Sequence, residues 1–169
     1  MVSNRRGSGA DITYMIIFLA GLAVVAVLGA FINAEVSQGF RDAGVLTPVA
    51  EEAINSTEQA ISDGLLDNVF LIIFAGMILS IVILAFMINV NPAFIVVYII
   101  VTIINVLVSI PIANFYYEFK TNAILAGTAS GFTIQNYIMS NLPITIFLIS
   151  LLVGIVTYGK MASSQGGGI

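Results

Sequence analysis

The sequence contains no cysteine, no histidine and no tryptophan. Without cysteine the chain forms no disulfide, offers no thiolate nucleophile and cannot ligate an iron–sulfur cluster. Without histidine it lacks the commonest general base and the commonest metal-ligating side chain. These absences argue against redox enzymes and zinc proteases. We therefore expect no catalytic residue, no metal, no cofactor and no small-molecule substrate.

Charge is scarce as well. Only 8% of the residues are charged and 59% are apolar, whereas about 25% of an average soluble domain is charged. Nine acidic and five basic residues give a net charge of −4, so no basic patch is available for direct nucleic-acid binding. Residues 68–117, between Asp67 and Glu118, carry no charge at all. This composition indicates an integral membrane protein in contact with a lipid bilayer.

Four apolar runs lie along the chain, at residues 12–32, 69–88, 93–112 and 143–161. A helix of about 20 residues crosses the hydrocarbon core, which is about 30 Å thick. The fourth run begins at Pro143, a residue that suits the first turn of a helix. Alternating barrel strands are not seen. The sequence therefore predicts an all-α integral membrane protein with four transmembrane helices.

The second and third runs are separated only by residues 89–92, Asn-Val-Asn-Pro. Asn-Pro is a turn signal, because the residue before proline avoids the helical conformation. One continuous kinked helix is the alternative, but it would need a hydrophobic layer far thicker than a bilayer. We therefore expect a tight antiparallel hairpin of membrane-spanning helices.

Residues 33–68 differ in kind, because they hold seven of the nine acidic residues. The first helix is expected to continue past the membrane as far as Gly44. Thr47 and Pro48 suit the cap and first position of a second helix, and Gly64 suits its end. The segment is therefore predicted to be an acidic extramembrane helical hairpin, facing water, with a thin alanine-rich stripe for packing on a neighbouring helix.

Four acids of this hairpin are candidates for binding a partner: Glu51, Glu52, Glu58 and Asp63. Carboxylate oxygens are also calcium ligands, but the spacing of these four matches no EF-hand loop. A solvated helix face or a protein contact is therefore the expected role.

Residues 113–142 form the second long connection. Aromatic residues concentrate where a membrane meets water, so the cluster at 115–119 is expected to mark the end of the third helix, close to Pro111. A short helix at 122–127 and a loop at 128–131 are expected to follow. The whole connection is then an interfacial or re-entrant segment packed against the bundle.

The positions of the lysine and arginine residues favour one orientation of the chain in the membrane. With four spans, three of the five lie on the side of the two termini, within residues 1–11 and at the end of the fourth run: Arg5, Arg6 and Lys160. Arg41 and Lys120 lie on the other side. The count of three against two favours both termini in the cytoplasm or interior. The run at 12–32 exceeds the core of a cleavable signal, about 7–15 residues, so we expect it to be retained. Residues 162–169 are expected to be a flexible tail.

Thr102, Asn105 and Ser109 share one face of the third run. Such a stripe could line a pore, or it could pack helices through interhelical hydrogen bonds worth about 1 kcal/mol each. No ionisable residue lies in this run, although proton-coupled transporters normally need one at that depth. Helix packing is therefore the favoured interpretation, with pore lining as the alternative.

The second half of the chain carries a recognisable pattern over residues 69–160. A hairpin of spans is followed by residues 113–118 (ANFYYE), a small polar segment, residues 140–144 (SNLPI) and a last span ending in 158–160 (YGK). This pattern resembles small multispan membrane proteins encoded by viruses of bacteria and archaea. The resemblance implies a virion or phage membrane component, structural or concerned with genome delivery, and no catalytic residue.

The leading hypothesis is a non-enzymatic membrane protein that acts as a structural or assembly component of a larger, viral or cellular complex. Other membrane subunits would be its partners, in a homo- or hetero-oligomer within the cell inner membrane or a virion membrane. The alternative is an oligomeric pore, a holin-like permeabiliser or a genome-delivery channel. A membrane enzyme using Glu118 and Lys120 is disfavoured, because these residues are explained by the aromatic interface and the loop beside it.

Overall fold

The computed structural model describes residues 10–87 and 92–166. Within these residues every regular element is a helix: α1 (Ala10–Asp42), α2 (Pro48–Ser62), α3 (Leu65–Met87), α4 (Pro92–Lys120), α5 (Ala126–Ala129), α6 (Thr133–Ser140) and α7 (Leu142–Gly166). By length and composition, α1, α3, α4 and α7 are each able to cross a membrane. The predicted all-helical bundle with four long apolar helices is confirmed.

Local capping sets the boundaries around α2. The Oγ1 atom of Thr47 accepts a hydrogen bond from the amide of Ala50 at 3.3 Å, so Thr47 is the N-cap and Pro48 the first helical residue. Gly44 follows α1 and Gly64 follows α2, with φ angles of 65° and 83°. Glycine adopts this left-handed conformation without steric cost. The predicted limits of both helices are confirmed.

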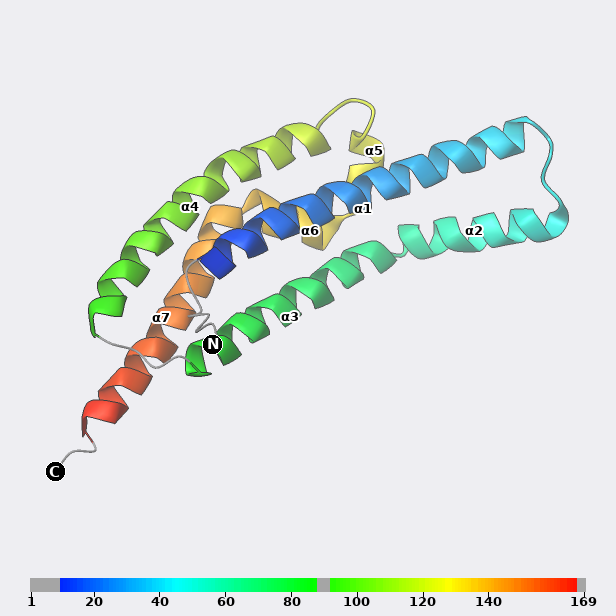
Figure 1. The fold of residues 1–169 in the computed structure, drawn as a ribbon. Coiled ribbons are helices and arrows are strands. Elements are labelled where there is room, and N and C mark those ends of the chain that lie inside the picture. Colours follow the sequence, from blue (N-terminus) through cyan, green and yellow to red (C-terminus); the bar gives the residue numbers. More distant parts are fainter. Residues whose placement is uncertain (1–9, 88–91, 167–169) are drawn as a thin grey trace, which may run out of the picture.

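Helix α7 lies between α3 and α4 and packs most extensively against α4, then against α3 (Figure 1). Helix α1 packs on both α3 and α4. The turn of the expected hairpin, at residues 88–91, lies outside the described residues. Helices α3 and α4 therefore have α7 as a common neighbour, instead of forming a closely packed pair.

The third helix extends beyond the apolar run at 93–112 and ends at the aromatic cluster, as expected. Helix α4 continues through Pro111 and the aromatic cluster to Lys120, and it is bowed along its length in Figure 1. Proline removes one backbone hydrogen bond and favours a bend, but a long helix packed on neighbours tolerates that loss. The short helix expected at 122–127 is displaced, because α5 occupies Ala126–Ala129.

The last helix begins where the sequence predicts, but it ends later. Helix α7 begins at Leu142 with Pro143 in its first turn, as predicted. It continues to Gly166, so the tail expected at 162–169 is helical through most of its length. The Ser163 hydroxyl donates to the carbonyl of Lys160 at 2.8 Å inside this last part.

The main core lies where α1, α3, α4, α6 and α7 meet. Ile16, Tyr116, Met139 and Ile146 are fully buried in it. The outward faces of the long helices carry exposed isoleucine, leucine and valine side chains. The apolar residues of each long helix therefore divide between one face in the core and one face left open.

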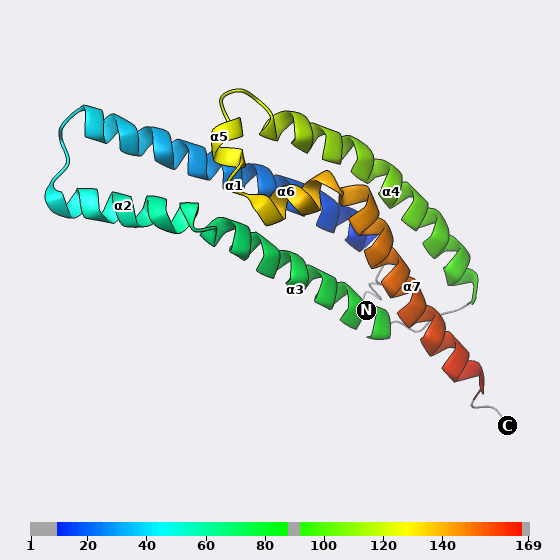
Figure 2. The ribbon, with the colours of Figure 1, turned by 180° about the vertical axis from the view of Figure 1, so that it is seen from behind.

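The C-terminal part of α1 and the whole of α2 extend beyond the end of α4 (Figures 1 and 2). We call residues 33–64 the α1–α2 projection. Arg41 on α1 forms a two-pronged ion pair with Glu58 on α2, with N–O distances of 2.7 and 3.1 Å. Arg41 also donates to Asn55 at 2.8 Å. The hydrogen bond from Arg41 holds the pKa of the Glu58 carboxyl below its ordinary value.

This lowered pKa makes the packing of α2 on α1 dependent on pH. The ion pair contributes fully above the pKa of a free glutamate, about 4.3, and the contribution is lost as the pH falls through the lower folded value. Spin labels at Val36 and Gln59 should therefore show a distance distribution that broadens below about pH 4. In a Glu58→Gln background the distribution should be broad at neutral pH and independent of pH. A narrow distribution in that background would show that Arg41 does not hold the two helices together.

Candidate functional site

Asp67 is a buried acid in the first turn of α3, with 5% of its surface exposed. Its two carboxylate oxygens accept hydrogen bonds from the backbone amides of Ile134 and Gln135, both with N–O distances of 2.7 Å. These amides belong to the first turn of α6, where backbone donors have no partner inside the helix. The preceding residue, Phe132, provides no side-chain cap. Asp67 therefore caps α6 from a different helix, where the helix dipole also favours a negative charge.

The sequence-based placement of Asp67 in a water-facing segment is wrong. Asp67 precedes Phe70 by three residues and Phe74 by seven, so the three lie on one face of α3. Phe70 and Phe74 are both buried, with ring centres 6.5 Å apart. The helical spacing of Asp67, Phe70 and Phe74 was the signal in the sequence that Asp67 lies on the buried face of α3.

Gln135 continues the network into the bundle. Its Nε2 atom donates to the carbonyl of Ala23 on α1 at 3.1 Å and to the Tyr116 hydroxyl on α4 at 2.8 Å. The Tyr116 hydroxyl donates to Asn136 at 2.8 Å, and Asn136 donates to the carbonyl of Ala129 at 2.7 Å. The sequence analysis missed Gln135 and Asn136, although two adjacent amides inside an apolar run were a usable signal.

We call Asp67, Tyr116, Gln135 and Asn136 the α6 network. Its hydrogen bonds join α1, α3, α4, α5 and α6, and within the described residues Gln135 Oε1 is its one buried side-chain atom without a partner. The Asp67 carboxylate is occupied by two backbone amides, and the Tyr116 hydroxyl by the side chains of Gln135 and Asn136. The chemistry of the network is therefore suited to holding helices together.

Lys120 and Glu118, the residues considered for an interfacial enzyme, have separate surroundings. Lys120 donates to the Ser140 hydroxyl at 2.8 Å and lies 5.6 Å from the centre of the Tyr117 ring. This arrangement fastens the end of α4 to the end of α6. Glu118 is exposed.

Thr102, Asn105 and Ser109 face different neighbours. Asn105 is buried and accepts a hydrogen bond from the Thr13 hydroxyl on α1 at 2.5 Å. Ser109 is also buried and donates to the carbonyl of Val106 in its own helix at 2.7 Å. Thr102 faces α7. Asn105 therefore takes part in interhelical bonding, and the three side chains do not form one continuous polar surface.

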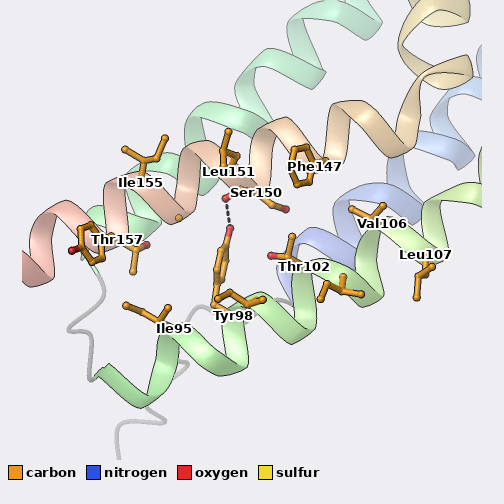
Figure 3. Close-up of a pocket in the computed structure, with 14 residues that line it drawn as sticks. Ile95, Tyr98, Thr102, Val106, Leu107, Phe147, Ser150, Leu151, Ile155 and Thr157 are labelled. Carbon is orange, nitrogen blue, oxygen red and sulfur yellow. Dashed lines mark hydrogen bonds between the residues drawn. The ribbon is translucent and has the colours of Figure 1, made fainter.

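Thr102 lies in a groove of about 580 Å³ between α4 and α7, which we call the α4–α7 groove. Its walls are almost entirely apolar and include Leu107, Phe147 and Leu151. Figure 3 shows the Tyr98 hydroxyl reaching across to the carbonyl of Ser150, a hydrogen bond of 2.6 Å. The hydroxyls of Thr102 and Ser150 lie on the facing sides of the two helices in the same view, and each lacks a hydrogen-bond partner of ordinary geometry.

The candidate partner-binding acids are divided between two roles. Glu51, Glu52 and Asp63 are exposed, whereas Glu58 is engaged by Arg41. No group of acidic side chains in residues 10–87 and 92–166 is gathered closely enough to hold a metal ion. The three exposed acids are therefore presented singly along the α1–α2 projection.

Comparison with known proteins found no matching family model, no matching curated protein and no matching solved structure. Function is therefore inferred from the α6 network, the α4–α7 groove and the α1–α2 projection.

Proposed function

We propose that this chain is a non-enzymatic integral membrane protein that serves as a structural or assembly subunit of a larger membrane complex. The observation that carries the proposal is the use of the polar groups inside the bundle. Asp67, Gln135 and Asn105 bond to other helices, and the outward faces of the long helices are apolar. Such a molecule is equipped for holding a shape in lipid and for contacting neighbours.

In this proposal α1, α3, α4 and α7 cross the bilayer, and the α1–α2 projection stands in water. Both termini then lie on the opposite side, in the cytoplasm or interior. The projection carries six acids and one base, and that base is paired with Glu58. Glu51, Glu52 and Asp63 would be available to a partner subunit. Their charge favours a partner with a basic surface.

The membrane is either a cell inner membrane or the membrane of a virion. The resemblance of residues 69–160 to membrane proteins of viruses that infect bacteria and archaea supports the second. Virion genes beside the coding sequence would agree with that assignment, and a cellular operon would contradict it.

The proposal predicts an assembly of several chains. Native mass spectrometry from lipid nanodiscs should show masses near multiples of 17.9 kDa, or 17.9 kDa added to a co-purified partner. Chemical cross-linking in the membrane of origin should show the same species. A lone 17.9 kDa chain in both measurements would contradict the proposal.

A pore or holin-like permeabiliser is the competing function. In the single bundle, Asn105 and Ser109 are turned inward and bonded, so a path along them would require α1 to leave its place. Conductance across a planar bilayer separates the two functions. We expect no current from the purified oligomer, and a steady unitary current would favour the pore.

A further inference from the structure

We infer that the α4–α7 groove of one copy receives α3 of a second copy, through the surface around Gly76 and Ser80. This inference rests on the proposed function and names the contact that builds the assembly. It combines four observations: the groove, a buried hydroxyl in the groove, an α3 face without neighbours among the described residues, and the common depth of the groove and the α3 face in the bundle.

The groove has a buried polar group that makes no hydrogen bond of ordinary geometry within the described residues. Ser150 lines the groove and is only 1% exposed, and the polar group beside its hydroxyl is the Tyr98 hydroxyl, which is bonded to the Ser150 carbonyl. A buried hydroxyl without a hydrogen bond is unfavourable in apolar surroundings. Rotation between staggered rotamers is accessible to serine, so the hydroxyl can turn toward an acceptor placed in the groove. A hydrocarbon chain provides no acceptor, whereas a helix with a polar side chain does.

Helix α3 presents a matching face. Gly76 and Ser80 are exposed and four residues apart, the spacing that lets membrane helices approach closely. A Cβ atom at Gly76 would meet no other atom within 4 Å, so this face has no neighbour among the described residues. The Ser80 hydroxyl donates to the Gly76 carbonyl at 2.8 Å. Its oxygen keeps lone pairs that can accept a hydrogen bond.

The two surfaces lie at the same depth. Lys160 on α7 donates to the carbonyl of Phe86 on α3 at 2.6 Å, which aligns these helices as they run away from α6 (Figure 1). Gly76 and Ser80 precede Phe86 by the same numbers of residues as Ser150 and Gly154 precede Lys160. With a rise of about 1.5 Å per residue, each pair falls at one level. Copies related by an axis normal to the membrane would therefore meet without a vertical shift.

Helix α1 also has exposed glycines, but it fits the groove less well. The carbonyl of Ala23 bonds to Gln135 of α6, which places Gly21 near the α6 end of the bundle. The α4–α7 groove lies farther from α6, at the level of Tyr98 and Ser150. The α1 face also lacks a hydroxyl at Gly21.

The contact is head-to-tail, because the groove and the α3 face are different surfaces of one chain. Each copy then keeps one free groove and one free α3 until the assembly closes. Such contacts build rings when the rotation closes and filaments when it does not.

Single cysteines test the contact directly, since the natural chain contains none. Ser80→Cys and Leu151→Cys should be made in separately tagged copies, mixed in lipid membranes and oxidised. We expect a cross-linked species of about twice 17.9 kDa in the mixture and in neither variant alone. Leu148→Cys is the matched control, because Leu148 is exposed on α7 but does not line the groove.

Each outcome decides a different point. A cross-link from Ser80→Cys alone would indicate a symmetric α3 contact and overturn the inference. Oligomers in native mass spectrometry without the mixed cross-link would leave the proposed function standing and exclude this contact, including the case in which lipid fills the groove. A lone monomer in every measurement would contradict both the proposed function and the contact through the α4–α7 groove.

A bulky residue at Gly76 gives an independent readout. Gly76→Leu adds a side chain where the single chain has open space, so the bundle should fold normally while dissociation increases by about tenfold or more, because close helix approach is lost. Gly21→Leu is the control, since Gly21 also has open space around it. Equal dissociation in the two variants would contradict a contact through α3.

Discussion

Replacement of Asp67 with alanine should lower the free energy of unfolding by about 2–4 kcal/mol, because it leaves one buried and one partly buried amide without an acceptor, and a buried amide alone costs about 1–3 kcal/mol. Those amides belong to Ile134 and Gln135 at the start of α6. Unfolding by dodecyl sulfate in mixed micelles, followed by circular dichroism and tyrosine fluorescence, measures the loss. The bundle should keep its long helices while α6 becomes accessible to protease.

Two further substitutions separate capping from charge. Asp67→Asn keeps one carbonyl oxygen and should fall between the natural chain and Asp67→Ala. Asp63→Asn, four residues earlier and exposed, should change stability by less than about 0.5 kcal/mol. If Asp67→Asn and Asp63→Asn had equal effects, the capping role of Asp67 would be wrong.

The second large effect is expected at Tyr116, the largest fully buried side chain among the described residues. Tyr116→Ala should cost about 3–5 kcal/mol, as is usual when a buried aromatic ring is removed. Tyr116→Phe keeps the ring and removes the hydroxyl that joins Gln135 to Asn136, so it should cost about 1 kcal/mol. The same mixed-micelle unfolding measures both.

The adjacent Tyr117 is the natural comparison, because it is 58% exposed. Tyr117→Ala should cost less than about 1 kcal/mol, since it removes surface contacts and the weak attraction between its ring and Lys120. A loss at Tyr117 as large as that at Tyr116 would mean that α4 is rotated relative to this structure.

Local rules were sufficient for the long helices and for α2. The four apolar runs are long enough to identify four helices without knowledge of the fold. The limits of α2 depend on Thr47, Pro48 and Gly64, whose preferences act within a few residues. These parts of the structure follow from short-range chemistry.

The limits of the apolar runs did not predict where α4 and α7 end. The apolar run ends at residue 112, directly after Pro111, yet α4 continues to Lys120 and contacts α6. The polar tail suggested disorder, yet α7 extends to Gly166. In both places a weak local preference against a helix is outweighed by the continuity of a long one.

The candidate site could be predicted only in part. Helical periodicity placed Thr102, Asn105 and Ser109 on one face, but it could not say that Asn105 meets α1 and Thr102 meets α7. The α6 network depends on contacts between residues far apart in sequence, such as Gln135 and Ala23. No short window of the sequence contains both partners of the bonds to Asp67 and Ala23, which span 67 to 112 residues.

The cap on α6 also constrains how the protein is made. Asp67 and the amide of Ile134 are 67 residues apart, so at a synthesis rate of about 5–20 residues per second Asp67 is made about 3–13 s before the amide that it binds. A lone carboxylate is costly in hydrocarbon. If α3 crosses the bilayer as proposed, its start has to stay in contact with water, or shielded by the insertion machinery, until α6 has been made. In that topology the packing of the first half of the chain is completed only by the second.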